Sequence, residues 1–188
     1  MKLAEYVAQF LASFSPRIYG VCGAGAMHLN DALVHHPGIK FIPMHHEQAA
    51  AFAAEADARV TNQFGFVHVT AGRGVTNAIT GVACAWADSI PLLVLAGQVE
   101  SRTLMHGAPL RQLGISEVDG VALMKPITKF AVCLHDPKKV RQVLEQAVFL
   151  AKDGRPGPVY IEIPLDIQAA EINPDDLVRF HQTKFPKA

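Results

Sequence analysis

One carboxylate, Glu47, stands where a short apolar run ends and an alanine-rich stretch begins. The run covers residues 40–44, and the alanines that follow lie at positions 49, 50, 51, 53, 54, 56 and 58. Alanine favours helix and lets neighbouring backbones approach closely, so Glu47 is predicted to open a helix that runs to Thr61. An acid in the first turn can simply complement the helix dipole. Because this helix has almost no polar face, we instead expect Glu47 to be partly buried and suited to proton transfer.

Two glycine-rich turns are predicted to lie near ligands. Residues 20–25 (GVCGAG) follow a short predicted strand, and residues 72–74 (GRG) follow another and open a helix that carries Thr76 and Asn77. Such turns bring backbone close to a ligand, or merely join a strand to a helix. Neither spells Gly-x-Gly-x-x-Gly, and no acid that could hold a ribose follows. A nucleotide-dependent dehydrogenase is therefore disfavoured.

The hydrophobic pattern alternates between strand and helix periods along the chain. Alternation of this kind predicts an α/β fold, a three-layer sandwich with a mostly parallel central sheet and helices on both faces. Ligands then lie beyond the carboxyl ends of the strands. The predicted helices cover residues 3–14, 26–34, 47–61, 75–86, 118–124 and 137–151, and the predicted strands cover 18–21, 41–42, 66–70, 92–96, 130–133 and 159–163.

Composition excludes several classes of function. The 188 residues are 50% hydrophobic and 18% charged with a formal net charge of zero, which indicates one well-packed domain without a basic surface for nucleic acid. No apolar run reaches the roughly 18 residues of a membrane helix, and the opening residues do not read as a signal peptide, so we expect a cytoplasmic protein. Neither the three cysteines nor the nine histidines follow a metal-binding spacing, so we expect no metal site in this chain.

Five motifs, taken together and in order, resemble the N-terminal pyrimidine-binding domain of thiamine-diphosphate enzymes, with the acetolactate synthases and their relatives as the nearest group. The similarity runs from about Glu5 to Gln168. It implies a pyrimidine-binding domain over residues 1–170, followed by a linker or tail over 171–188 that leads toward a missing central domain. The motifs are His46-Glu47-Gln48-Ala49-Ala50, residues 72–77 (GRGVTN), 88–91 (DSIP), 97–99 (GQV) and 155–159 (RPGPV).

The resemblance implies roles for individual residues. The glutamate that matches Glu47 holds N1′ of the aminopyrimidine ring and is the catalytic acid/base. It promotes the tautomer that takes the proton from the thiazolium C2, after which the cofactor attacks a 2-oxo group. The cofactor-binding residues implied beside Glu47 are Thr70, Gly72, Gly74 and Asn77, and the substrate-pocket residues are Gly25 and Gln98. A glutamine such as Gln98 can equally satisfy backbone groups at the end of a strand.

The chain also departs from this family. Arg73 stands between the glycines where proline is usual, and Asp57 stands where an aromatic residue is common. Residues 114–119 (GISEVD) lack the Phe-Gln that precedes the glutamate of biosynthetic acetohydroxyacid synthases, and Pro164-Leu165-Asp166 replaces Pro-Lys-Asp. These positions help to build the substrate end of the pocket. The departures therefore favour a related lyase or carboligase over a role in amino-acid biosynthesis.

No stretch of the chain matches the motif with which these enzymes bind Mg²⁺ and the cofactor's diphosphate. The family implies that a partner subunit supplies that domain, in a homodimer or higher homo-oligomer, and that a small-molecule substrate binds between them. The chain is then one domain of a longer enzyme or one subunit of a split thiamine-diphosphate decarboxylase. A non-catalytic binding or regulatory module is the alternative. FAD is possible in the family, but nothing in this chain supports it.

Overall fold

The computed structural model describes residues 1–105 and 107–182, and these residues form a six-stranded sheet. The strand order is β2-β1-β3-β4-β6-β5, and every pair of neighbours is parallel. Helical segments connect the strands, as parallel pairing requires. The strands are β1 (Arg17–Gly20), β2 (Lys40–Pro43), β3 (Gly65–Val69), β4 (Leu92–Gln98), β5 (Phe130–Cys133) and β6 (Val159–Pro164).

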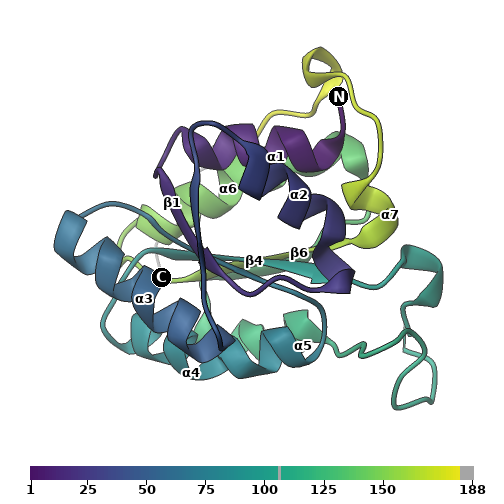
Figure 1. Ribbon diagram of the computed structural model, residues 1–188, viewed down its shortest axis with the longest axis horizontal. Coiled ribbons are helices and arrows are strands. Elements are labelled where there is room, and N and C mark those ends of the chain that lie inside the picture. Colours follow the sequence, from purple (N-terminus) through teal and green to yellow (C-terminus); the bar gives the residue numbers. More distant parts are fainter. Residues whose placement is uncertain (106, 183–188) are drawn as a thin grey trace.

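Helices cover both faces of this sheet (Figure 1). One face carries α1 (Leu3–Ala12), α2 (Met27–His35), α6 (Val140–Lys152) and α7 (Leu165–Gln168), and the other carries α3 (Glu47–Thr61), α4 (Arg73–Ala87) and α5 (Gly120–Met124). The two faces enclose separate apolar cores. The arrangement confirms the predicted α/β three-layer sandwich.

The central strands are apolar along their whole length because both of their faces are covered. Every residue of β3 and β4 is buried. Within β4 the side chains alternate, so Leu93 and Leu95 pack under α1 and α6 while Val94 and Ala96 pack under α3 and α4. This near-continuous apolar pattern is typical of a parallel sheet.

The alanine-rich helix α3 has the predicted bounds. His46 caps its amino end, where the ring Nδ1 accepts a hydrogen bond from the Gln48 amide, and Asn62 ends it in the left-handed conformation with φ of 55°. The small side chains bring α3 against α4, since a Cβ added to Gly81 of α4 would lie 2.5 Å from Ala51 Cβ. Close approach through alanine is therefore confirmed.

Charged residues of α3 have partners. Asp57 accepts hydrogen bonds from the Arg17 Nε at 2.9 and 3.0 Å, which ties the helix to β1. Glu55 is paired with Arg59, and the same guanidinium reaches Asp88 beyond the end of α4 at 2.7 Å. Glu55, Asp57 and Arg59 of this helix therefore form ion pairs.

Most differences from the predicted elements are at their ends. Helix α4 begins at Arg73 because Gly72, with φ of 65°, turns the chain there, and β4 runs on to Gln98. Helix α5 begins at Gly120 because the Asp119 side chain caps it by accepting from the Ala122 amide. The short helix α7 was not predicted, since four residues carry too little periodicity.

Residues after α7 return along the body of the domain. Glu171 forms a bridge with Lys2, Leu177 is 7% exposed, and the Phe180 ring lies 5.6 Å from that of Phe149. The predicted linker covers 171–188, and its residues 183–188 lie outside the described part of the chain. The boundary at residue 170 stays a prediction.

Candidate functional site

The Glu47 carboxylate is held at the junction of two helices. Glu47 is the first residue of α3 and is 9% exposed, and its Oε2 accepts a hydrogen bond of 2.9 Å from Nδ2 of Asn77 in the first turns of α4. Among the described residues, this is the one hydrogen bond that the carboxylate accepts. The predicted residues Glu47 and Asn77 thus lie together, although 30 positions separate them in the sequence.

Glycines keep side-chain atoms away from this carboxylate. A Cβ on Gly74 would lie 3.0 Å from Thr70 Cγ2 and 3.5 Å from Glu47 Oε1, so Thr70, Gly74 and Glu47 are neighbours. The turn after β1 closes on Thr70 from another side. A Cβ would lie 2.6 Å from Thr70 Cβ at Gly23 and 3.3 Å from Thr70 Oγ1 at Gly25. Both glycine-rich turns therefore meet at Thr70, the residue that follows β3.

Gly72 joins β3 to α4 in a backbone conformation that other residues rarely adopt. Its φ is 65°, and a Cβ there would overlap the Ser116 carbonyl oxygen at 1.7 Å. The next residue, Arg73, donates a hydrogen bond of 2.7 Å to Ser116 Oγ and is exposed. The segment around Ser116 therefore covers the outer side of this turn.

His68 is a buried polar residue of this region that the sequence patterns did not single out. Its ring is fully buried on β3, with Nδ1 3.1 Å from the Leu95 carbonyl oxygen and Nε2 2.8 Å from Asn30 Oδ1. The Asn30 amide in turn donates to the Gly23 carbonyl at 3.0 Å. Burial lowers the His68 pKa to about 4, so the ring is neutral at pH 7. In the sequence, the signal that could have indicated this buried residue is a histidine between two valines of an apolar strand.

Gln98, the second predicted substrate-pocket residue, has other contacts. It is 1% exposed, its Nε2 donates to the Val118 carbonyl at 3.1 Å, and its Oε1 accepts from the Val99 amide at 2.9 Å. Gln98 thus satisfies backbone groups at the end of β4. The roles predicted for Gln98 and Gly25 in a substrate pocket stay predictions.

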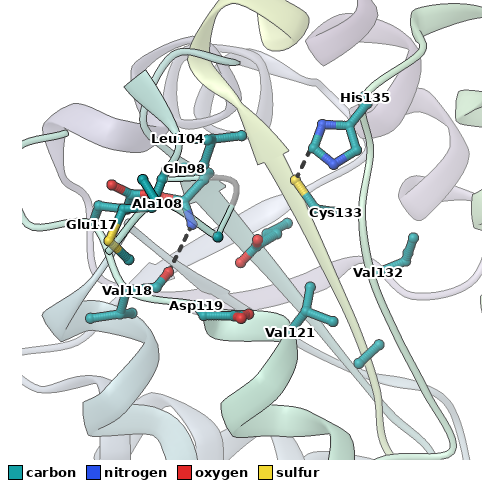
Figure 2. A pocket seen from close by; sticks show the side chains of 14 residues that line it. Gln98, Leu104, Ala108, Glu117, Val118, Asp119, Val121, Val132, Cys133 and His135 are labelled. Atoms are coloured by element: carbon teal, nitrogen blue, oxygen red, sulfur yellow. Dashed lines mark hydrogen bonds between the residues drawn. The ribbon is translucent and has the colours of Figure 1, made fainter. Parts of the chain in front are cut away.

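Gln98 also lines a cavity of about 480 Å³ at the carboxyl ends of β4, β6 and β5 (Figure 2). We call it the Glu162 cavity, because the buried Glu162 of β6 lines it together with Asp119, Val121, Val132 and Cys133. An acid inside the apolar strand β6 is the sequence signal that could have indicated it.

The described residues contain neither a group of metal ligands nor a helix that could span a membrane. Within residues 1–105 and 107–182, no three His, Cys, Asp or Glu side chains are grouped so that they could hold a metal ion. None of the helices in that same part of the chain has the combined length and apolar character of a transmembrane segment.

Comparison with known proteins identifies similar chains among acetolactate synthase large subunits of several organisms. The chain is 40% identical over 151 residues to the acetolactate synthase isozyme 3 large subunit of Escherichia coli (strain K12), which covers 80% of this chain and 25% of that relative. It is 38% identical over 155 residues to the acetolactate synthase large subunit of Lactococcus lactis subsp. lactis (strain IL1403), covering 82% of this chain and 26% of that relative. A probable acetolactate synthase large subunit of Methanocaldococcus jannaschii is 36% identical over 174 residues, covering 92% of this chain and 28% of that relative.

The chain spans about a quarter of the length of these curated relatives. Residues 1–123, which contain Glu47, Thr70, both glycine-rich turns and Asn77, match a family described as the N-terminal TPP-binding domain of thiamine pyrophosphate enzymes. Thiamine pyrophosphate is another name for thiamine diphosphate. The match confirms the resemblance seen in the sequence motifs, and the chain belongs to the family of N-terminal thiamine-pyrophosphate-binding domains of thiamine pyrophosphate enzymes.

Proposed function

We propose that this chain is the pyrimidine-binding half of an acetolactate synthase-like lyase or carboligase that acts on 2-oxo acids. The observation that carries the proposal is the Glu47 carboxylate, which is 9% exposed, fixed through Oε2 by Asn77 and free of other hydrogen bonds from the described residues. A carboxylate that has one oxygen fixed and the other available can bind a ring nitrogen and exchange a proton with it.

The residues around Glu47 fit an aminopyrimidine ring. Gly74 has no side chain, and a Cβ at this position would lie 3.5 Å from Glu47 Oε1. Gly23 and Gly25 allow the neighbouring turn to pack close to Thr70. Backbone without side chains allows a flat ring to approach closely. Thiamine diphosphate, when bound, supplies the carbon nucleophile and the electron sink for making or breaking a bond next to a carbonyl.

Each residue of the site has a distinct part in the mechanism. Glu47 holds a proton at Oε1 or releases it to the ring nitrogen, and its burial keeps that hydrogen bond from competition with water. Asn77 orients the carboxylate through Oε2 and so fixes the direction of Oε1. Gly23, Gly25 and Gly74 let the backbone pack closely around Thr70, beside the Glu47 carboxylate.

A partner must complete the site in this proposal. The described residues hold no cluster for Mg²⁺, so we assign the ion and the diphosphate group to a second domain of the same assembly. The outer faces of α3 and α4 carry partly exposed apolar side chains, Phe52 at 38% and Trp86 at 41%. Apolar side chains of this size favour a homodimer or higher homo-oligomer in which these helices meet their partner.

The test is the variant Glu47→Gln in the complete enzyme that contains this chain. The exchange of the cofactor's thiazolium C2 proton with deuterium, followed by NMR, reports on Glu47 separately from the later steps. We expect the exchange rate to fall by a factor of about 10² to 10⁴, because amide replaces acid without a change of shape. Turnover of pyruvate, used as the probe 2-oxo acid, should fall in parallel.

Glu55→Gln is the matched control, because Glu55 is also a buried acid of α3 but is paired with Arg59. It should leave the exchange rate unchanged. Equal exchange rates in wild type and Glu47→Gln would refute the acid/base role and would favour a non-catalytic binding or regulatory module.

A further inference from the structure

The Glu162 cavity lies on the α5 side of the sheet, at the carboxyl ends of three neighbouring strands. Side chains from Gln98 of β4, Glu162 of β6 and Ala131 and Cys133 of β5 line its floor. Its volume of about 480 Å³ lies within the range of small-molecule sites. Figure 2 shows Asp119, Val121, Val132 and Cys133 around the hollow.

The described chain between β4 and β5 contains only one short α-helix, α5. This helix is too short to cover the ends of both strands, and the uncovered part is the cavity. Helix α5 has only five residues, and its Gly120 packs against the strand below, where a Cβ would lie 2.2 Å from the Tyr160 hydroxyl and 2.5 Å from Glu162 Oε2. The helix therefore covers the strands as far as Tyr160 and Glu162. Beyond that point the segment that contains Leu104 and Met105 forms the wall.

The charged groups of the described lining are acidic. Glu162 is 4% exposed and accepts a hydrogen bond of 2.6 Å from the Tyr160 hydroxyl. Burial raises the pKa of Glu162 above its ordinary value, and burial likewise raises the pKa of Cys133 beside it. Asp119 uses Oδ1 to cap α5. The described lining residues include no lysine or arginine that could neutralise these carboxylates.

A third acid, Glu117, is committed to the wall of the cavity. Its Oε1 accepts from the Met105 amide at 2.6 Å, and its Oε2 accepts from the Leu113 and Gly114 amides at 3.0 and 3.1 Å. Three backbone donors therefore hold this carboxylate, and both of its oxygens are engaged. Glu162 and Asp119 are thus the acids left to face a ligand.

The rest of the lining is apolar. Val121 of α5, Ala131 of β5, and Leu104 and Ala108 of the wall segment contribute hydrocarbon surface, while the Val132 side chain packs toward the core on the other face of the sheet. His135 and Cys133 lie together at one side, with Nδ1 and Sγ 4.0 Å apart (Figure 2). An apolar surface with one acidic end suits a molecule that has a cationic head and a hydrocarbon body.

We propose that the Glu162 cavity is a second small-molecule site that binds a primary ammonium compound with a short hydrocarbon chain, its ammonium group directed to the carboxylates of Glu162 and Asp119. The ammonium group donates up to three hydrogen bonds, which match the acceptor oxygens of these acids. The hydrocarbon chain lies against Val121 and Ala131. This site does not include Glu47, Asn77 or Thr70, although Gln98, which the sequence assigns to the substrate pocket, lines it.

The test is an NMR titration of the 188-residue chain with n-butylammonium, followed through the backbone amides. The neutral 1-butanol and the anionic butyrate serve as probes of similar size. We expect n-butylammonium to shift the Val132 and Cys133 amides with a millimolar dissociation constant and to leave the Asn77 amide unmoved. Binding of 1-butanol should be weaker by about tenfold or more, and butyrate should not bind, because only the cation gains charge-assisted hydrogen bonds.

Two variants identify the residues responsible. Glu162→Gln keeps the side-chain shape and an acceptor for Tyr160, and should weaken n-butylammonium binding by about tenfold or more. Ala131→Leu fills the floor without touching a charge, and should abolish binding of both n-butylammonium and 1-butanol. Glu47→Gln is the matched control and should bind n-butylammonium as the wild type does.

The proposal is overturned if n-butylammonium leaves the Val132 and Cys133 amides unmoved in the folded wild-type chain, or if butyrate binds as tightly. Unchanged affinity in Ala131→Leu would also overturn it, and this variant decides the matter should Glu162→Gln fail to fold. Loss of binding in Glu47→Gln would contradict the separation of the two sites. Because the readout is binding to this chain, its outcome does not depend on whether Glu47 is catalytic.

Discussion

At the scale of single residues, His68 connects burial to the response of the protein to pH. The ring lies in the core two residues before Thr70, and its hydrogen-bond partners are Leu95 and Asn30. A neutral ring donates through one nitrogen, so the tautomer decides which of the two oxygens, Leu95 O or Asn30 Oδ1, receives the proton. Through Asn30 and the Gly23 carbonyl, the same network holds the turn that contacts Thr70.

We predict that His68 makes the folded protein less stable as the pH falls from 6.5 to 4. The pKa is about 4 in the folded chain and about 6.5 in the unfolded chain, so between these values the unfolded chain binds the extra proton. The free energy of unfolding should therefore drop by about 2 to 3 kcal/mol between pH 7 and pH 4.5 from this residue alone.

Urea unfolding of wild type and His68→Gln at the two pH values measures this contribution. Glutamine retains a donor and an acceptor but does not titrate, so the variant should lose less stability on acidification than the wild type. His181→Gln, at an exposed histidine, should follow the wild type. A His68→Gln variant with the full wild-type loss would show that the pH dependence comes from other groups.

At the scale of elements, the contact between α3 and α4 sets the geometry of the site. Glu47 opens one helix and Asn77 lies near the start of the other, so their 2.9 Å hydrogen bond depends on how closely the two helices pack. Gly81 and Ala51 form the closest part of that contact. A single glycine in α4 therefore controls a distance about one turn away along both helices.

We predict that Gly81→Val separates these helices. Its Cβ would lie 2.5 Å from Ala51 Cβ and 3.1 Å from the Phe52 nitrogen, and such overpacking costs about 1 to 3 kcal/mol. The variant should unfold at a lower urea concentration, and the Asn77 side-chain amide signals should shift as the bond to Glu47 lengthens. Thr80→Val, on the exposed side of α4, is the control and should change stability by no more than about 0.5 kcal/mol. Wild-type stability in Gly81→Val would mean that the helices can part at no cost.

At the scale of the whole molecule, the two ends of the described chain hold each other in place. The amide of Leu3 donates to the Ala170 carbonyl at 2.9 Å, and the Ile172 amide donates to the Met1 carbonyl at 2.9 Å. Further along, the Phe180 amide donates to Glu145 Oε2 of α6 at 2.9 Å. Residues 171–180 therefore pack as part of the layer that contains α1 and α6.

We predict that Leu177→Ala lowers the free energy of unfolding by about 2 kcal/mol, because it removes a side chain that is 7% exposed and leaves a cavity. The neighbouring Val178, at 43% exposure, provides the matched control. Val178→Ala should change stability by no more than about 0.5 kcal/mol. Equal and small effects of both substitutions would mean that this segment contributes little to the fold.

Much of the fold could be predicted from the sequence because its signals are local. The alternation of apolar strands with amphipathic helices requires parallel strands joined by helical crossovers, and the alanines of α3 favour a helix over residues 47–61 whatever surrounds them. The start of α4 was harder to predict, because the positive φ of Gly72 accompanies a close contact with Ser116. Helix α7 is too short for any periodic pattern.

The sequence by itself determined the fold class and the position of Glu47 at the start of a helix, because residue type and spacing along the chain suffice for both, and its ordered motifs carried the resemblance to the family. Only the tertiary structure decided that Asn77 fixes the Glu47 carboxylate, that Gln98 turns to the Val118 carbonyl, and that Glu162 and Asp119 meet at one cavity. These contacts join residues from different strands and helices. Their distances follow from the strand order of the sheet and from the packing of helices on it, and no local pattern contains that information.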